Sequence, residues 1–279
     1  MPYIKSEEER KIIKEGGKIV GEILADIQQD LEPGVNLSDI DKEVESRIIE
    51  AGGSPVFKGY QPDLSKKPFP HAICASVNEE VVHGFADDYE LQEGDLVSID
   101  VGMEWPVEDS SQHIVNPHSE HGGYITDTAF SKIIGENEDK KAKELLNTTQ
   151  KALYKAIDKA RVGNAVAEIG KTVEEIVKPK GFGIVRRLCG HGVGHKIHEE
   201  PNVFNFHTKQ AEEQELKEGA VIAIEPMLTV SGNHEVTTGD NEWSIVTEDG
   251  SLSAHFEHTI IVESDGPVIA TKREGEEIL

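Results

Sequence analysis

The chain has 279 residues, with 53 Asp and Glu against 28 Lys and Arg, and a formal net charge of −25. This charge repels phosphate backbones, so it argues against direct binding to DNA. A chain of this length buries a core large enough to fold without cross-links. Its two cysteines, Cys74 and Cys189, do not form a disulfide framework.

The sequence contains neither a secretory signal nor a membrane span. The N-terminal residues MPYIKSEEERK have no apolar core. The longest apolar runs, such as 220–224, have about five residues, against the roughly 20 that a membrane span requires. We therefore expect a soluble, cytoplasmic protein that does not contact a membrane.

Two helices are predicted near the N-terminus. Ser6 and Glu9 form a capping-box pattern, and apolar residues then recur at helical spacing as far as Leu31. A second apolar stripe covers 40–48, and Gly52 follows as a stop signal.

Strand patterns follow in the segments SVNEEVVHGF, DLVSIDVGM and GGYITDTAF, at 76–85, 95–103 and 122–130. A long helix pattern then begins near residue 139, and a shorter helix and further strands come after it. The order of elements therefore restarts in the middle of the chain.

Three blocks align between the two halves, in order and at offsets between 125 and 130 residues. Any two amphipathic helices look alike, but three blocks in the same order favour an internal repeat. We predict one α+β domain built of two similar halves, about 1–135 and 136–279. The matched blocks are 33–53 with 162–182, 91–100 with 216–225, and 125–130 with 255–260.

The repeat also pairs four carboxylates in apolar, strand-like segments. Asp100 matches Glu225, and Asp127 matches Glu257. A buried carboxylate is costly unless it is paired or binds a metal. Four of them near a pseudo-two-fold axis cannot all stay ionised without cations between them. The sequence therefore predicts a metal site.

The segment CGHGVGHKIHEEP at 189–201 combines glycines with histidines. A phosphate-binding glycine loop is one interpretation, but no helix pattern follows directly, and the histidines would then be superfluous. The alternative is that His191 is a neutral nitrogen ligand and that the glycines leave room for the backbone of a substrate.

Together with VNEEVVHGF, SIDVGM, IEPML and SLSAHFEHTIIV, this segment resembles the type I methionine aminopeptidases, over nearly the whole chain. The resemblance implies the pita-bread fold, a pseudo-two-fold symmetric antiparallel sheet covered by helices. It implies a metalloaminopeptidase that removes the N-terminal methionine from nascent proteins with a small second residue, using water activated by two divalent cations (Co, Mn, Fe or Zn). The matching metal ligands are Asp100, Asp127, His191, Glu225 and Glu257.

The resemblance also implies catalytic roles. His83 would contact the scissile amide, His198 would donate to the substrate carbonyl oxygen as charge develops, and Glu225 would pass on the proton of the water. Asp127 and Glu257 would hold both cations.

A pocket for the methionine side chain is implied as well, although each of its residues could equally belong to the ordinary core. Met227 would lie near the cations, and a monovalent cation is expected near Asn78 and Ser253. The pocket residues are Phe57, Tyr60, Phe69, Cys74, Ile197 and Trp243.

The chain departs from the family pattern at 104–120, where roughly 16 extra residues separate Asp100 from Asp127. We interpret this insertion as a solvated hairpin tip rather than as an additional metal site. A shorter insertion at 61–68 is expected beside the pocket. The histidines that the longer insertion brings near the ligands are His113, His118 and His121.

Three other functions are less consistent with the sequence. X-Pro hydrolases of this fold carry an extra N-terminal domain of more than a hundred residues, whereas only about 70 residues precede the first motif here. Inactive binding modules of this fold lose ligands, and a phosphoesterase needs a basic clamp. Nascent chains are the expected partners. Because 228–257 contains no Lys or Arg, association with the ribosome would use other surfaces. We expect a monomer.

Overall fold

A computed structural model describes residues 4–62, 67–107, 115–119, 121–136 and 139–276. None of the helices in these residues combines the length and apolar character that crossing a bilayer requires. The helices described are α1 (Glu7–Asp30), α2 (Leu37–Glu50), α3 (Lys140–Ile157), α4 (Ala167–Val177), α5 (Lys209–Glu212) and the short 3-10 helix η2 (Lys178–Lys180).

The strands are short, except for the two that form the long central hairpin, β4 and β5. They are β1 (Ser54–Pro55), β2 (Cys74–Val77), β3 (Glu80–Val82), β4 (Leu96–Trp105), β5 (Tyr124–Ile133), β6 (Gly183–Ile184), β7 (Gly190–Gly192), β8 (Glu199–Val203), β9 (Val221–Ile224), β10 (Met227–Thr229), β11 (Val236–Thr238), β12 (Ile245–Thr247), β13 (Ser253–His255), β14 (Glu257–Glu263) and β15 (Gly266–Ile269).

The predicted start of the first helix is confirmed. The hydroxyl of Ser6 accepts a hydrogen bond from the Glu9 backbone N–H at 3.3 Å, and the Glu9 carboxylate accepts one from the Ser6 N–H at 2.6 Å. This reciprocal pair satisfies two backbone donors that would otherwise lack partners at the helix terminus. The segment 76–85, predicted as strand, forms the hairpin of β2 and β3 instead, with Asn78 in the left-handed conformation (φ 57°) at its turn.

The largest sheet has nine strands, and every pairing in it is antiparallel. Its central part runs in the order β2-β4-β5-β14-β9-β7, because β2 pairs with β4 beside the main path. The first three strands come from the first half of the chain and the last three from the second. The two halves therefore meet where β5 pairs with β14.

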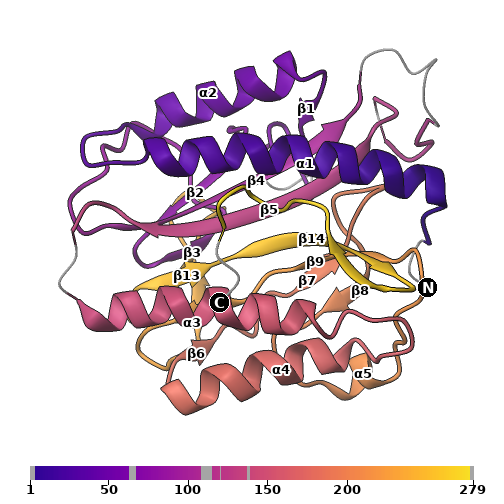
Figure 1. Cartoon of the computed structure of the whole chain (residues 1–279). Coiled ribbons are helices and arrows are strands. Elements are labelled where there is room, and N and C mark those ends of the chain that lie inside the picture. Colours follow the sequence, from indigo (N-terminus) through magenta and orange to yellow (C-terminus); the bar gives the residue numbers. More distant parts are fainter. Residues whose placement is uncertain (1–3, 63–66, 108–114, 120, 137–138, 277–279) are drawn as a thin grey trace.

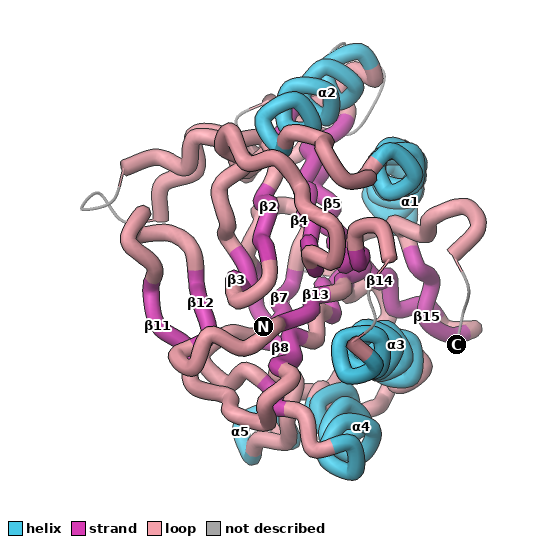
Figure 2. The backbone as a smooth tube through the Cα atoms, turned by 90° about the vertical axis from the view of Figure 1, so that its left-hand side faces the viewer, coloured by secondary structure: helices cyan, strands magenta, loops and turns pink. Residues whose placement is uncertain are grey.

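The helices cover one face of this sheet. Figure 1 shows α1 and α2 on one side of the molecule and α3 and α4 on the other, and Figure 2 shows all four around the same face of the large sheet. The small sheet of β3, β11 and β12 lies on the opposite side (Figure 2). An α+β fold with an antiparallel sheet covered by helices is thus confirmed, and the main core lies between helices and sheet.

The C-terminal segment packs into this helix layer. A side chain on Gly17 of α1 would come within 2.6 Å of the Ala270 carbonyl oxygen, and one on Gly21 within 2.9 Å of the Lys272 carbonyl oxygen. Only glycine permits so close an approach of two backbones. The segment after β15 therefore lies against α1, near the junction of β5 and β14.

Candidate active site

The strand register places three of the four predicted acids, Asp100, Asp127 and Glu257, on one face of the sheet. In the β2–β4–β5–β14 ladder, Cys74 lies opposite Asp100, Asp100 opposite Ala129, and Ala129 opposite Glu257. Side chains in such a row point to the same face, and so does Asp127, two residues before Ala129. The small Ala129 leaves the space between the carboxylates open.

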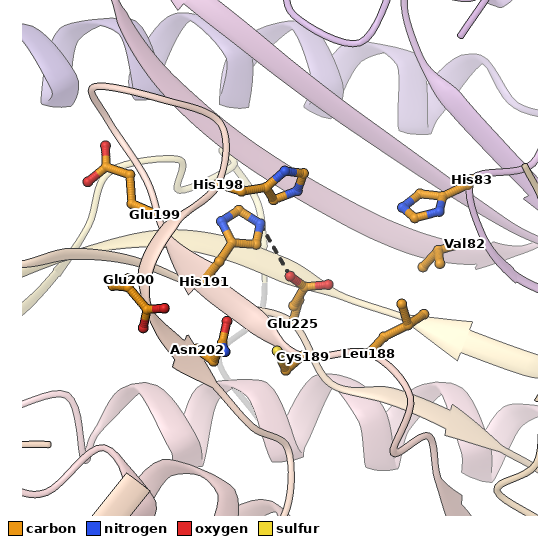
Figure 3. Close-up of a pocket in the computed structure, with 10 residues that line it drawn as sticks. All are labelled: Val82, His83, Leu188, Cys189, His191, His198, Glu199, Glu200, Asn202 and Glu225. Carbon is orange, nitrogen blue, oxygen red and sulfur yellow. Dashed lines mark ion pairs between the residues drawn. The ribbon is translucent and has the colours of Figure 1, made fainter. Parts of the chain in front are cut away.

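The remaining two predicted ligands come from β7 and from the residue after β9. The His191 Nε2 lies 3.4 Å from Glu225 Oε1 and 3.9 Å from Asp127 Oδ2. Figure 3 shows the His191 ring and the Glu225 carboxylate pointing toward each other. Asp127, His191 and Glu257 each offer one ligand atom, all within 4.8 Å of one another. The structure therefore brings all five predicted ligands to one place.

The His191 ring is oriented for ligation by its own backbone. Its Nδ1 lies 3.0 Å from the Gly192 carbonyl oxygen, which can only accept a hydrogen bond, so Nδ1 carries the proton. The Nε2 lone pair then faces the acids. Burial, together with the nearby His198, lowers the pKa of His191 to about 3, which keeps the ring neutral. A neutral imidazole of this kind is a good metal ligand.

The four acids carry negative charge that nearby positively charged side chains do not balance. Burial and mutual repulsion raise the pKa values of Asp100, Glu225 and Glu257 well above their ordinary values, and burial raises the pKa of Asp127 to about 7. One oxygen each of Asp100, Asp127 and Glu257 is buried without a hydrogen-bond partner in the described part of the chain. These residues fit a divalent cation, because carboxylate oxygens with one imidazole nitrogen suit such ions.

The glycines of 189–201 serve a purpose different from the one predicted. A side chain on Gly190 would collide with the Ala223 carbonyl, and one on Gly192 with the Glu200 carbonyl. The glycines thus let neighbouring strands of the same chain approach closely, and the prediction that they make room for a substrate backbone was wrong at these two positions. This packing fixes His191 between them.

The two predicted non-ligand histidines face each other across the site. His83 and His198 both line two cavities that meet at the acids. His83 adopts a left-handed backbone conformation (φ 60°), a costly state for this residue that often marks functional positions. The Tyr60 hydroxyl lies 3.0 Å from His198 Nδ1, and the His198 ring stands edge-on to His191 at 4.5 Å.

One of these cavities, of about 310 Å³, is mostly apolar. The buried Phe69, Cys74 and Trp243 form its main cluster, against which Phe57 and Tyr60 pack. Asp100 and Asp127 also reach it, so an apolar side chain held there would lie beside the acids. The structure thus brings all six predicted pocket residues together: Phe57, Tyr60, Phe69, Cys74, Ile197 and Trp243.

The second cavity, of about 430 Å³, shares His83 and His198 with the first, and Figure 3 shows the residues that line it. His191 and Glu225 line it together with the partly buried thiol of Cys189. The other cysteine, Cys74, is unsuited to nucleophilic chemistry, because burial and the charges of neighbouring acids such as Asp100 raise its pKa well above the ordinary value.

The predicted monovalent-cation position is compact. The Ser253 hydroxyl lies 3.3 Å from the carbonyl oxygen of Asn78 and 2.8 Å from that of Glu80. Two backbone oxygens therefore converge beside Ser253, an arrangement that suits a hard cation.

The longer insertion differs from its prediction at both ends. β4 continues to Trp105, which lies opposite Tyr124, so the insertion begins after 105 and not at 104. Asn116 is only 1% exposed and donates to the His195 carbonyl at 2.9 Å. The free hairpin predicted over 104–120 is therefore anchored to the loop that carries His198.

The two described histidines of this insertion, His118 and His121, take no part in the cluster described above. Among the described residues the only group of potential ligands that could hold a metal lies elsewhere, and the His118 ring instead packs 5.4 Å from that of His195. His113 lies outside the described residues. The shorter insertion borders the apolar cavity, because Pro62 lines it and the Lys67 carbonyl accepts a hydrogen bond from the Trp243 indole.

Sequence reasoning missed one residue of the site. His255 is 1% exposed, and its Nε2 lies 3.8 Å from Glu225 Oε2 and 4.0 Å from Glu257 Oε2. A signal was available, because His255 comes two residues before Glu257 in an extended segment, where alternation places both on one face.

Comparisons with known proteins agree with this geometry. The model of metallopeptidase family M24 matches residues 11–264. The chain is 36% identical to the methionine aminopeptidase of Clostridium perfringens over 97% of its own length and 99% of that protein. It is 34% identical to methionine aminopeptidase 1 of Bacillus subtilis, with 98% and 100% covered.

Solved structures show the same relationship. The methionine aminopeptidase of Thermotoga maritima superposes with a TM-score of 0.86 at 34% identity, covering 98% of this chain and 100% of that one. The prolidase of Pyrococcus furiosus shares only the fold, with a TM-score of 0.69 at 24% identity, and this chain covers 66% of it. The pita-bread fold is thereby confirmed, and the chain belongs to metallopeptidase family M24 and, within that family, to the methionine aminopeptidases.

Proposed function

We propose that the protein removes the N-terminal methionine from nascent polypeptides whose second residue is small. The observation that carries this proposal is the meeting of an apolar cavity with buried, uncompensated acids at Asp100 and Asp127. A methionine side chain in that cavity brings its own peptide bond to the acids. The names of the relatives support the same reaction.

The four acids and His191 would hold two divalent cations. Asp127 and Glu257 would serve both, Asp100 one of them, and His191 with Glu225 the other. When bound, such ions lower the pKa of a water molecule and stabilise both ends of a hydrolytic displacement. The unpartnered oxygens of Asp100, Asp127 and Glu257 support this assignment, and Co, Mn, Fe and Zn all suit the ligand set.

The neighbouring side chains position the substrate and move protons. When the Tyr60 hydroxyl donates to His198 Nδ1, the neutral ring carries its proton on Nε2. That proton is then donated to the scissile carbonyl oxygen as it gains charge. His83 contacts the leaving amide nitrogen, and the Glu225 carboxylate accepts the proton released from water and transfers it to the new amino group.

We further propose one catalytic domain made of the two halves 1–135 and 136–279, which supply matching strands on either side of the β5–β14 pair. Asn78 and Ser253 hold a monovalent cation. The protein works in the cytoplasm as a monomer, and any association with ribosomes uses surfaces other than 228–257.

The test is a peptide-hydrolysis assay on purified protein loaded with Mn²⁺, Co²⁺ or Fe²⁺. We expect release of methionine from Met-Ala-Ser, little from Met-Lys-Ser, and no release from Ala-Pro-Ser. Chelation should abolish activity, and the same ions should restore it.

Three results would contradict the proposal. Full activity in metal-free protein would exclude the cations, and release of alanine from Ala-Pro-Ser would indicate an X-Pro hydrolase instead. Equal rates on Met-Ala-Ser and Met-Lys-Ser would exclude the selection for a small second residue.

A further inference from the structure

Two fully buried histidines, His255 and His258, lie close to Glu257 in the sequence. His258 has a partner at each of its two ring nitrogens. His258, one residue after Glu257, lies 3.0 Å from the Thr271 hydroxyl through Nδ1 and 3.4 Å from the Tyr154 hydroxyl through Nε2. The Nε2 of His255 has no hydrogen-bond partner in the described part of the chain. Buried polar atoms nearly always have one, so this nitrogen requires an explanation.

The unpartnered atom points at two acids, both from the second half of the chain. His255 Nε2 lies 3.8 Å from Glu225 Oε2 and 4.0 Å from Glu257 Oε2. Both distances are too long for a hydrogen bond, yet a small rotation of either side chain would close them. In the β10–β13 ladder, His255 lies opposite the buried Met227.

Glu225 is the acid for which such a partner matters most. Its Oε1 faces His191 at 3.4 Å, while its Oε2 faces His255, so the carboxylate lies between two imidazoles. In metal sites, the groups that hydrogen-bond to a ligating carboxylate fix its orientation, and their loss typically costs about 10–100-fold in metal affinity.

We propose that His255 is a positioning residue of the metal site: its Nε2–H donates to Glu225 Oε2 and so holds the carboxylate in the orientation that binds the cation beside His191. This inference rests on the proposed function for the presence of the cations. His255 acts through Glu225 and does not itself bind metal or substrate.

The first test compares His255→Leu with His255→Gln, whose amide retains an N–H donor. Calorimetric titration with Mn²⁺ and elemental analysis give the affinity and the number of bound ions. We expect His255→Leu to bind the same number of ions about 10–100-fold more weakly, and His255→Gln to recover most of the affinity. An unchanged affinity in folded His255→Leu would overturn the proposal.

Leu228→Ala is the matched control. Leu228 is fully buried, lies next to Met227 in β10 and points to the opposite face, so its truncation lowers the melting temperature without removing a polar group. Its metal affinity should equal that of the wild type. A loss as large as that of His255→Leu would mean that His255 contributes only to packing.

A second measurement needs no variant. In ¹⁵N-histidine protein loaded with ¹¹³Cd²⁺, the His191 Nε2 should show coupling to cadmium, whereas the His255 Nε2 should carry a proton and show none. Cadmium coupling at His255 would make it a ligand and overturn the positioning role. Because both tests measure metal binding, they decide the role of His255 even if the loaded protein fails to release methionine.

Discussion

The pair of strands β5 and β14 buries charged groups on both of its faces, and the protein treats the two faces differently. On the helix side, the buried Arg273 donates to the Thr128 hydroxyl at 2.9 Å and pairs with Glu276. On the cavity side, Asp127 and Glu257 are equally buried, but in the described residues only histidines, and no Lys or Arg, lie within ion-pair distance of them.

The pKa values of Glu276 and Asp127 differ between the two faces in the same way. Although burial alone would raise it, the pKa of Glu276 is held well below its ordinary value by His258 and Arg273. Burial raises the pKa of Asp127 to about 7. The helix face carries its own cation and contributes to stability, whereas the cavity face depends on cations from outside. A buried acid therefore indicates a functional site when no positively charged side chain of the protein lies beside it.

The largest effect is expected when the cavity face loses one acid. Asp127→Asn should reduce methionine release about 10³-fold or more, because a metal site contributes several kcal/mol to the transition state. In chelator-treated protein, the same change should preserve or raise the free energy of unfolding, because a neutral amide relieves repulsion. Peptide hydrolysis and urea unfolding measure the two effects.

Asp41→Asn is the matched control for this change. Asp41 is also buried, but it accepts hydrogen bonds from the Ala72 and Ile73 N–H groups at 2.8 and 3.1 Å. Its substitution should lower the free energy of unfolding without loss of bound metal. If Asp127→Asn destabilised the metal-free protein as much as Asp41→Asn, the contrast between compensated and uncompensated acids would fail.

A substitution on the helix face should change the free energy of unfolding. Arg273→Met leaves Glu276 buried without its cation, so we expect the free energy of unfolding to fall by about 3–5 kcal/mol. Lys11→Met, which breaks the exposed pair with Glu7, should change it far less. Urea unfolding compares the two, and equal effects would show that the buried network is not stabilising.

The free energy of unfolding of the metal-free protein should depend on pH through buried acids on both faces of the β5–β14 pair. Because the folded pKa of Asp127, about 7, exceeds its ordinary 3.8, the native state holds an extra proton between these values. Stability should therefore fall as pH rises from about 4 to 7, by about 1.4 kcal/mol per pH unit for one proton. Glu276 has the opposite sign, since its stabilisation is lost as pH falls below its ordinary 4.5.

Urea midpoints at pH 5, 6 and 7 measure the slope for Asp127. Saturating Mn²⁺ should reduce or reverse it, and in the metal-free protein Asp127→Asn should make it less steep by the share of one proton, because the raised pKa values of Asp100, Glu225 and Glu257 contribute with the same sign. A slope of the same size in that variant would assign the extra proton to a group other than Asp127.

The smallest effect is expected at the insertion. His118 packs against His195 and does not belong to the cluster of acids, so His118→Ala should leave the number of bound ions unchanged. Elemental analysis of the loaded variant measures this. Loss of one bound ion in this variant would mean that His118 helps to hold a cation. The cavity face would then not be the only place where the described residues bind one.

Much of the fold could be predicted from local patterns. The Ser6–Glu9 capping box and the apolar stripe after it predicted α1, and the structure has both. The repeat placed the four acids in strand-like segments, and the sheet brings Asp100, Asp127 and Glu257 to one face, while Glu225 directly follows β9. These signals are local or periodic, so they survive in the sequence without knowledge of long-range contacts.

Other features depend on contacts between distant segments. The glycines at 190 and 192 face carbonyls of other strands, and Asn116 is buried against a loop 79 residues away. Local composition describes neither contact, so the polar insertion resembled a free hairpin. Its boundary was misplaced because the ladder with β5 extends β4 to Trp105.

The sequence by itself determined the helices, most of the strands and the five predicted ligands that gather at the site, because capping, periodicity and motif spacing are properties of the chain. Only the tertiary structure decided which buried charges are compensated. His255 and His258 are three positions apart and equally buried, yet one meets Tyr154 and Thr271 and the other meets the acids. Their environments differ because packing between distant elements, not local sequence, supplies the partners of a buried group.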